Sequence, residues 1–150
     1  MATEGKLAQE CILCDIDPAT NKTFIKSYEY YTVLANFKQP TLGAVLIVLD
    51  RHIPKLSDWN IDERAEYPIV VDDVENALEQ AFQPDRINHE MLANKVNHVH
   101  WHVVPRYQHE RVFANNTWSD ENYGVRAKLN MPEKGQIIIE QVVAELQKHL

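Results

Sequence analysis

The sequence predicts an α+β fold, with a mainly antiparallel sheet, a main helix and a C-terminal helix. Two strand-like regions come first, a helical pattern separates them from two more strand-like regions, and a second helical pattern follows. Strands that follow one another, instead of alternating with helices, favour antiparallel pairing. A length of 150 residues suits a single domain, residues 1–150, with a sizeable buried core.

The first two strand-like regions precede the main helix. Residues 23–37 are rich in β-branched and aromatic side chains, which is typical of one or two strands. Residues 43–52 read "GAVLIVLDRH", an almost continuous apolar run. Such a run indicates a central strand whose two faces are both covered.

The main helix is predicted between residues 60 and 82. Its apolar side chains recur at helical spacing, at Tyr67, Val71, Val74, Leu78 and Phe82. Asn60 with Glu63 three residues later is a capping-box pattern, so we expect the helix to begin there. Pro68 is a poor interior helix residue, and we expect a kink or a restart at that point.

The second half of the chain continues the pattern. Residues 85–92 and the stronger segment 98–104 are predicted strands. Residues 108–132 show no clear period and are expected to form a long irregular loop. From Lys134 onward the spacing is helical again, with one side formed by Ile138, Val142, Leu146 and Leu150.

Composition limits the classes of partner. The formal net charge of −7 argues against long nucleic acids, which are held mainly by Lys and Arg, but leaves a small nucleotide possible. No apolar run reaches the roughly 18 residues of a membrane span, and the first residues do not resemble a secretory signal. We therefore expect a cytoplasmic protein, in which two cysteines are thiols or metal ligands.

Three histidines alternate in the segment "HVHWHVV", residues 98–104. Because side chains on a strand alternate between faces, His98, His100 and His102 should share one face and Trp101 the other. Three such imidazoles could bind a metal together, act on a phosphate with one ring as nucleophile, or be buried and merely hydrogen-bonded. The third explanation is the weakest, since each buried imidazole needs a partner.

A second candidate motif is the cysteine pair near the start. Cys11 and Cys14 have the C-x-x-C spacing of a zinc knuckle, and a redox pair is the alternative. A closed tetrahedral zinc site needs two further ligands.

The alternating histidines resemble the signature of the histidine triad (HIT) superfamily. Pro105 and Arg106 after them, and Leu92, Asn94 and Val96 before them, are similar to its bacterial HIT-like hydrolase branch. The resemblance covers roughly residues 11–107. The sequence departs from the family pattern at two places, both in the region expected to contact the phosphate and ribose. A Gly-rich loop that many relatives carry before the triad is shortened here to "LANK". A Gly-His pair common in the third-strand region of the family is replaced here by Gly43-Ala44.

The resemblance implies nucleotide chemistry at an α-phosphate, on a mononucleotide derivative or a dinucleoside polyphosphate. It makes His100 the nucleophile that forms a nucleotidyl-histidine intermediate, which water or another acceptor then cleaves. His102 would hydrogen-bond the leaving group or phosphate, and His98 would buttress the row. Asn94 is implied as a contact of the α-phosphate and Asn36 as a weaker candidate for the ribose; for both, a turn residue is the alternative.

The resemblance also implies a structural zinc ion and a homodimer. In some relatives two cysteines, a histidine after the third-strand region and the first triad histidine hold zinc, which here correspond to Cys11, Cys14, His52 and His98. The chemistry itself would need no metal. Two other functions stay open: a metalloenzyme with its metal on the three triad histidines, and a nucleotide-binding module without turnover.

Three residues after the triad have two possible uses each. Trp118 and Tyr123 could close over a base, although packing within their loop is the better explanation. Arg106 could steer phosphate or make a surface ion pair of small energetic value.

Overall fold

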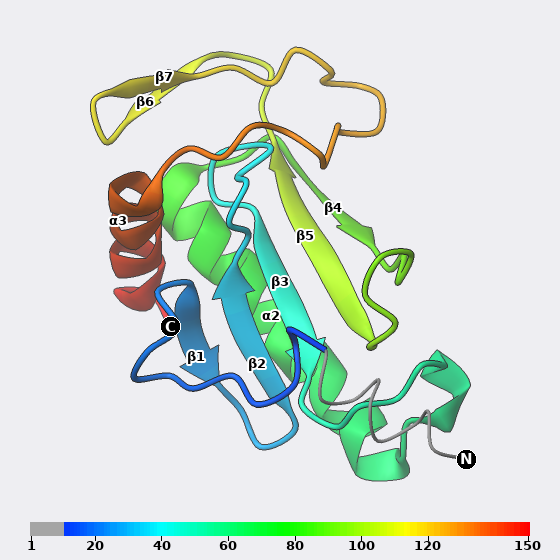
Figure 1. Cartoon of the computed structure of the whole chain (residues 1–150). Helices are drawn as coiled ribbons and strands as arrows, with labels where there is room; N and C mark the ends of the chain where they lie inside the picture. The colour runs from blue at the N-terminus through cyan, green and yellow to red at the C-terminus, as the bar shows by residue number, and fades with distance from the viewer. Residues whose placement is uncertain (1–10) are drawn as a thin grey trace.

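The computed structural model, which describes residues 11–150, has a five-stranded sheet with two long helices packed on it (Figure 1). The strands are β1 (Phe24–Ser27), β2 (Tyr31–Ala35), β3 (Val45–Leu49), β4 (Arg86–Glu90) and β5 (His100–Arg106). They lie in the order β1-β2-β3-β5-β4, and every neighbouring pair is antiparallel. The predicted α+β class is confirmed.

Strands β2 and β3 have packed side chains on both faces, as the apolar run of residues 43–52 predicted for β3. On one face the helices α2 (Ile61–Phe82) and α3 (Gln136–Gln147) pack against strand residues such as Ile47 and Trp101. On the other face Leu13, from the N-terminal segment, packs against Leu34 and Val48. That segment crosses the sheet opposite α2, as the blue part of the chain in Figure 1 shows.

Helix α2 begins where the sequence predicted and runs for 22 residues without interruption. The Asn60 side chain accepts from the backbone N–H of Glu63, and the Glu63 carboxylate accepts from the N–H of Asn60. The expected restart at Pro68 was wrong. Pro68 is exposed, while Val70 and Val74 beyond it are buried against the sheet. Tertiary packing of the apolar side outweighs the hydrogen bond that proline removes.

The far end of α2 explains why residue 43 is a glycine. Gly43 has φ +88°, and a Cβ at that position would lie 2.7 Å from the Phe82 ring. A side chain there would therefore meet both backbone strain and a clash, so glycine suits the turn into β3.

The prediction of an irregular loop over residues 108–132 was wrong in part. The strands β6 (Arg111–Phe113) and β7 (Asn116–Trp118) form a two-stranded hairpin, which projects beyond the end of the main sheet (Figure 1). Ala114 and Asn115 at its turn both have positive φ, 54° and 56°, as a tight hairpin turn requires. Two three-residue strands are too short to show a period, and alanine is not a usual signal for this turn.

Arg106 does not make the surface ion pair that the sequence suggested. Its side chain is 3% exposed and lies against Asp120, whose side chain is 4% exposed, at 2.7 Å. It also donates to the carbonyl oxygens of Asn122 and Val125 and to Asn88. Arg106 therefore anchors the segment that runs from the hairpin towards α3. Within residues 11–150, no helix combines the length and apolar character needed to cross a bilayer.

Candidate functional site

The histidines lie at the start of β5, which begins at His100, two residues later than predicted. His100 and His102 face away from the helices, because Trp101 and Val103 between them belong to the core beneath α2. The His100 and His102 rings lie edge to face, with their centroids 5.3 Å apart. His98 precedes the strand and is fully buried.

The proton on the His100 ring can be assigned from its partner. Nδ1 of His100 lies 2.6 Å from the backbone carbonyl oxygen of His98. A carbonyl oxygen only accepts, so Nδ1 carries the hydrogen, and the lone pair of the neutral ring is on Nε2. The same reasoning applies to His98, whose Nε2 lies 2.5 Å from the carbonyl oxygen of Leu49. Each neutral ring therefore keeps one unprotonated nitrogen that can act as a nucleophile or a ligand.

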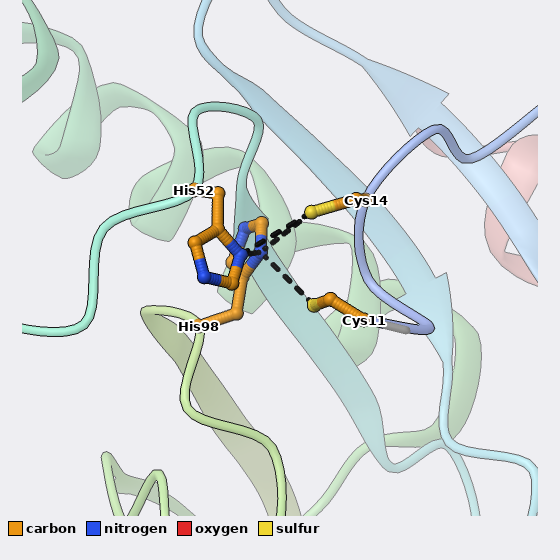
Figure 2. Close-up of side chains that lie close together, drawn as sticks. All are labelled: Cys11, Cys14, His52 and His98. Carbon is orange, nitrogen blue, oxygen red and sulfur yellow. Dashed lines mark hydrogen bonds between the residues drawn. The ribbon is translucent and has the colours of Figure 1, made fainter. Parts of the chain in front are cut away.

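The unprotonated nitrogen of His98 faces the cysteine pair (Figure 2). Nδ1 of His98 lies 3.4 Å from Sγ of Cys11, 3.6 Å from Sγ of Cys14 and 3.1 Å from Nδ1 of His52. Nδ1 of His52 is 3.3 Å from Sγ of Cys14. All four ligand atoms lie within 4.8 Å of one another. The cysteines come from the N-terminal segment, and the histidines from the segments after β3 and before β5.

This cluster fits a tetrahedral zinc ion. Zn–S distances of about 2.3 Å and Zn–N distances of about 2.0–2.1 Å place the ligands of a tetrahedral site about 3.3–3.8 Å apart. The contacts between the four side chains cover nearly the same range. Burial raises the pKa of the Cys14 thiol to about 11, so a bound dication is needed to hold it as a thiolate near neutral pH. The hydrogen bond from His98 to Leu49 is the outer contact typical of a histidine that binds a metal.

Among residues 11–150, this is the one group of side chains that converges as metal ligands. The fold does not bring His98, His100 and His102 together as ligands of one metal ion, which was the alternative expectation. The His98 ring faces the cysteines, whereas His100 and His102 line a neighbouring cavity that His98 does not line.

The cavity beside His100 and His102 has a volume of about 810 Å³, within the range of small-molecule sites. Four segments far apart in the chain line it: Ile12 and Leu13; Asn36 to Lys38; Leu92 to Val96; and Arg126 to Asn130. Ile12, Phe37 and Leu92 are exposed apolar side chains on its wall. The cavity thus combines two imidazoles with an apolar surface that a planar base could cover.

The charged side chains lining the cavity are all positive. Lys38, Lys95, Arg126 and Lys128 line it, and no carboxylate does so among the described residues. This contrasts with the net charge of −7 for the whole chain. Lys38 also donates to Asn130 at 2.5 Å, which joins the loop after β2 to the segment before α3. The cavity is therefore suited to an anionic ligand.

Both predicted asparagines line this cavity. Asn94 is exposed, in the connection between β4 and β5. Asn36 is 9% exposed, and its side chain accepts from the N–H of Lys38, which makes it a turn residue at the end of β2 as well.

The aromatic residues of the later loop lie elsewhere. Trp118 is buried and donates to the carbonyl oxygen of Phe113. Tyr123 lies beside Gln108. Neither lines the cavity with the histidines, in agreement with their interpretation as packing residues.

Sequence reasoning missed the contribution of residues 126–130. These residues lay in a region without a period, and only the fold brings them to the histidines.

Known proteins share sequence and fold with this chain. The HIT domain family model matches residues 17–109. Protein hit of Bacillus subtilis (strain 168) is 30% identical over 107 residues, which cover 67% of this chain and 73% of the relative. This similarity is consistent with a bacterial HIT-like branch.

Two solved structures show the same fold at low identity. A Hit-like protein involved in cell-cycle regulation from Bartonella henselae, solved with an unknown ligand, has a TM-score of 0.65 at 17% identity, covering 85% of this chain and 86% of that one. A Zn-bound histidine triad family protein from Mycobacterium smegmatis has a TM-score of 0.62 at 18% identity, covering 94% and 98%. With its family match over more than half of its length, the chain belongs to the HIT family.

Proposed function

We propose that the protein is a nucleotide hydrolase or nucleotidyl transferase that acts at an α-phosphate through a covalent intermediate on His100. The observation that carries this proposal is the hydrogen bond from Nδ1 of His100 to the His98 carbonyl, which leaves the Nε2 lone pair on a ring that lines the cavity. A neutral imidazole held in one tautomer is a competent nucleophile near neutral pH.

The reaction would have two steps. Nε2 of His100 forms a bond to the α-phosphorus, and the bond from phosphorus to the leaving group breaks with its electron pair. His102, beside His100 in the cavity, keeps the lone pair of its Nε2 available for the second step. Water then attacks the phosphorus and gives a proton to His102, and the P–N pair returns to His100. Asn94 is proposed to contact the phosphate and Asn36 the ribose.

The positive lining favours a phosphoanhydride over a phosphoramidate substrate. An α-phosphate alone carries about one charge, whereas a nucleoside polyphosphate or dinucleoside polyphosphate carries several. The cations at Lys95 and Lys128 have no hydrogen-bonded partner among the described residues, so they are available to the additional phosphates.

We propose a structural role for zinc on Cys11, Cys14, His52 and His98. The relative from Mycobacterium smegmatis is Zn-bound, and the four ligand atoms here lie within 4.8 Å of one another. The ion would link the N-terminal segment to the sheet, and its ligand His98 also holds the ring of His100. A homodimer and a cytoplasmic location remain predictions. Sedimentation of the purified protein would test whether it is a homodimer.

The decisive experiment is incubation with diadenosine polyphosphates and with adenosine phosphoramidate, followed by mass spectrometry of the trapped protein. We expect a nucleotidyl adduct on His100, and we expect His100→Ala to fold, bind AMP and lose turnover. Turnover near the wild-type level in that variant would refute the assignment. AMP binding by the wild type without adduct or turnover would instead indicate a non-catalytic binding module, and loss of turnover with a chelator that spares the fold would indicate a metalloenzyme.

A further inference from the structure

Two polar atoms beside the catalytic face lack partners. Nδ1 of His102 and Oε2 of Glu90 are both buried, and neither makes a hydrogen bond within residues 11–150. Buried polar atoms of this kind are rare in folded proteins and usually indicate a functional contact or a bound water. Here the two belong to one place in the sheet, because β4 and β5 pair in the register that sets Glu90 opposite His102.

Opposite residues of an antiparallel pair project from the same face. Their Cβ atoms lie about 4.5–5.5 Å apart, so a glutamate carboxylate can reach an imidazole directly or through one water. The residue opposite His102 on its other side, Leu46 of β3, is apolar and offers no competing partner. Glu90 is therefore the carboxylate that the strand register places beside His102.

Arg126 binds the other oxygen of the Glu90 carboxylate, Oε1. Its Nε donates to Oε1 of Glu90 at 2.8 Å, and Arg126 itself lines the cavity. Oε2 is then the oxygen left for His102, on the buried side of the pair.

We propose that Glu90 is a positioning residue for His102: its carboxylate accepts the Nδ1–H of His102, which leaves the lone pair on Nε2 directed to the cavity. The value of this contact for catalysis rests on the proposed function. In the hydrolytic step a proton leaves the attacking water for Nε2 of His102, which requires that this nitrogen be unprotonated beforehand. A fixed Nδ1–H tautomer provides that state.

Burial and three neighbouring side chains affect the pKa of His102. Burial lowers its pKa and the neighbouring His100 lowers it further, Glu90 raises it, and Arg126 lowers it. Glu90 and Arg126 form an ion pair but act on the histidine with opposite sign. If the ion pair had only a structural role, removing Glu90 or removing Arg126 should have the same effect on His102. Variants of the two residues are therefore matched controls for each other.

The test is long-range 1H–15N NMR of the histidine-labelled full chain without substrate, with the His102 signals identified by their loss in His102→Asn. We expect the Nδ1–H tautomer in the wild type. In Glu90→Ala that tautomer should give way to Nε2–H and the pKa of His102 should fall. Arg126→Gln should retain the tautomer and raise the pKa, and Glu90→Gln should retain part of the tautomer because its amide oxygen still accepts.

Kinetics provide the second readout. Glu90→Ala should lower kcat by about 10- to 100-fold, the loss typical when a carboxylate that orients a functional histidine is removed, with a smaller change in KM. Glu90→Gln should recover part of that loss. An unchanged His102 tautomer in Glu90→Ala, or pKa shifts of the same sign in Glu90→Gln and Arg126→Gln, would overturn the proposal. Because the NMR experiment uses resting protein, its outcome is independent of whether His100 forms an adduct.

Discussion

The backbone carbonyl of His98 accepts a hydrogen bond from Nδ1 of His100 at 2.6 Å, while the ring of His98 faces the cysteines. One residue thus contacts the proposed nucleophile with its main chain and the cluster with its side chain. Any shift of residue 98 changes the direction of the carbonyl that orients His100. The proposed zinc site and the proposed catalytic histidines are therefore predicted to be coupled through His98.

The coupling can be tested by removing one thiolate. We expect Cys14→Ser to lose zinc, to unfold at a lower temperature and to turn over about 10- to 100-fold more slowly, as when an outer contact of a functional histidine is lost. Metal analysis, thermal unfolding and steady-state kinetics measure the three effects. The control is His102→Asn, which should retain zinc and lose turnover. A Cys14→Ser protein with full zinc content would contradict the assignment of this ligand.

The positive cavity lining predicts a preference for several phosphates. In a His100→Ala background, where no chemistry occurs, Lys95→Gln and Lys128→Gln should each weaken the binding of ATP by about 1 kcal/mol, roughly fivefold in Kd. AMP binding should change less, and the difference should shrink at high salt. Calorimetric titration measures both ligands. Lys148→Gln removes a cation that follows the last residue of α3 and pairs with Glu145, and it should change neither affinity.

The buried pair of Arg106 and Asp120 should be important for stability. Asp120→Ala leaves a guanidinium that is 3% exposed without its carboxylate, and we expect a loss of about 3 kcal/mol in the free energy of unfolding. Urea denaturation measures it. The double variant Arg106→Met with Asp120→Ala removes both charges and should be less destabilised than Asp120→Ala alone. Equal losses in the two proteins would show that the charge left behind is not the cause.

Acidification should destabilise the fold partly through His102. Burial lowers the pKa of His102 in the folded protein, so the unfolded chain binds this proton more readily. The stabilisation is complete above the unfolded pKa of about 6.5, and it is lost as the pH falls from there through the lower folded pKa. With a chelator present throughout, the unfolding free energy should fall less in His102→Asn than in the wild type between about pH 7.5 and 5.5. His109→Asn, at an exposed position, should retain the wild-type slope.

Several parts of the fold could be predicted because local sequence determines them. The capping box of Asn60 and Glu63 acts within one helical turn, and the alternation of His100 and Trp101 decides which side chain faces the core. By contrast, the restart expected at Pro68 does not occur, because helix α2 gains more from its apolar contacts with the sheet than it loses at one hydrogen bond. Arg106 was misjudged because nothing near it in the sequence shows that Asp120 will enclose it.

The ligand set and the row of histidines were recognisable from the spacing of residue types and the family resemblance, since both depend on short motifs. Only the tertiary structure brought Arg126 and Lys128 to the cavity and set Glu90 opposite His102. The physical reason is that strand register and loop placement follow from the packing of the whole core. A side chain more than ten positions away along the chain acquires its partner only when that core has formed.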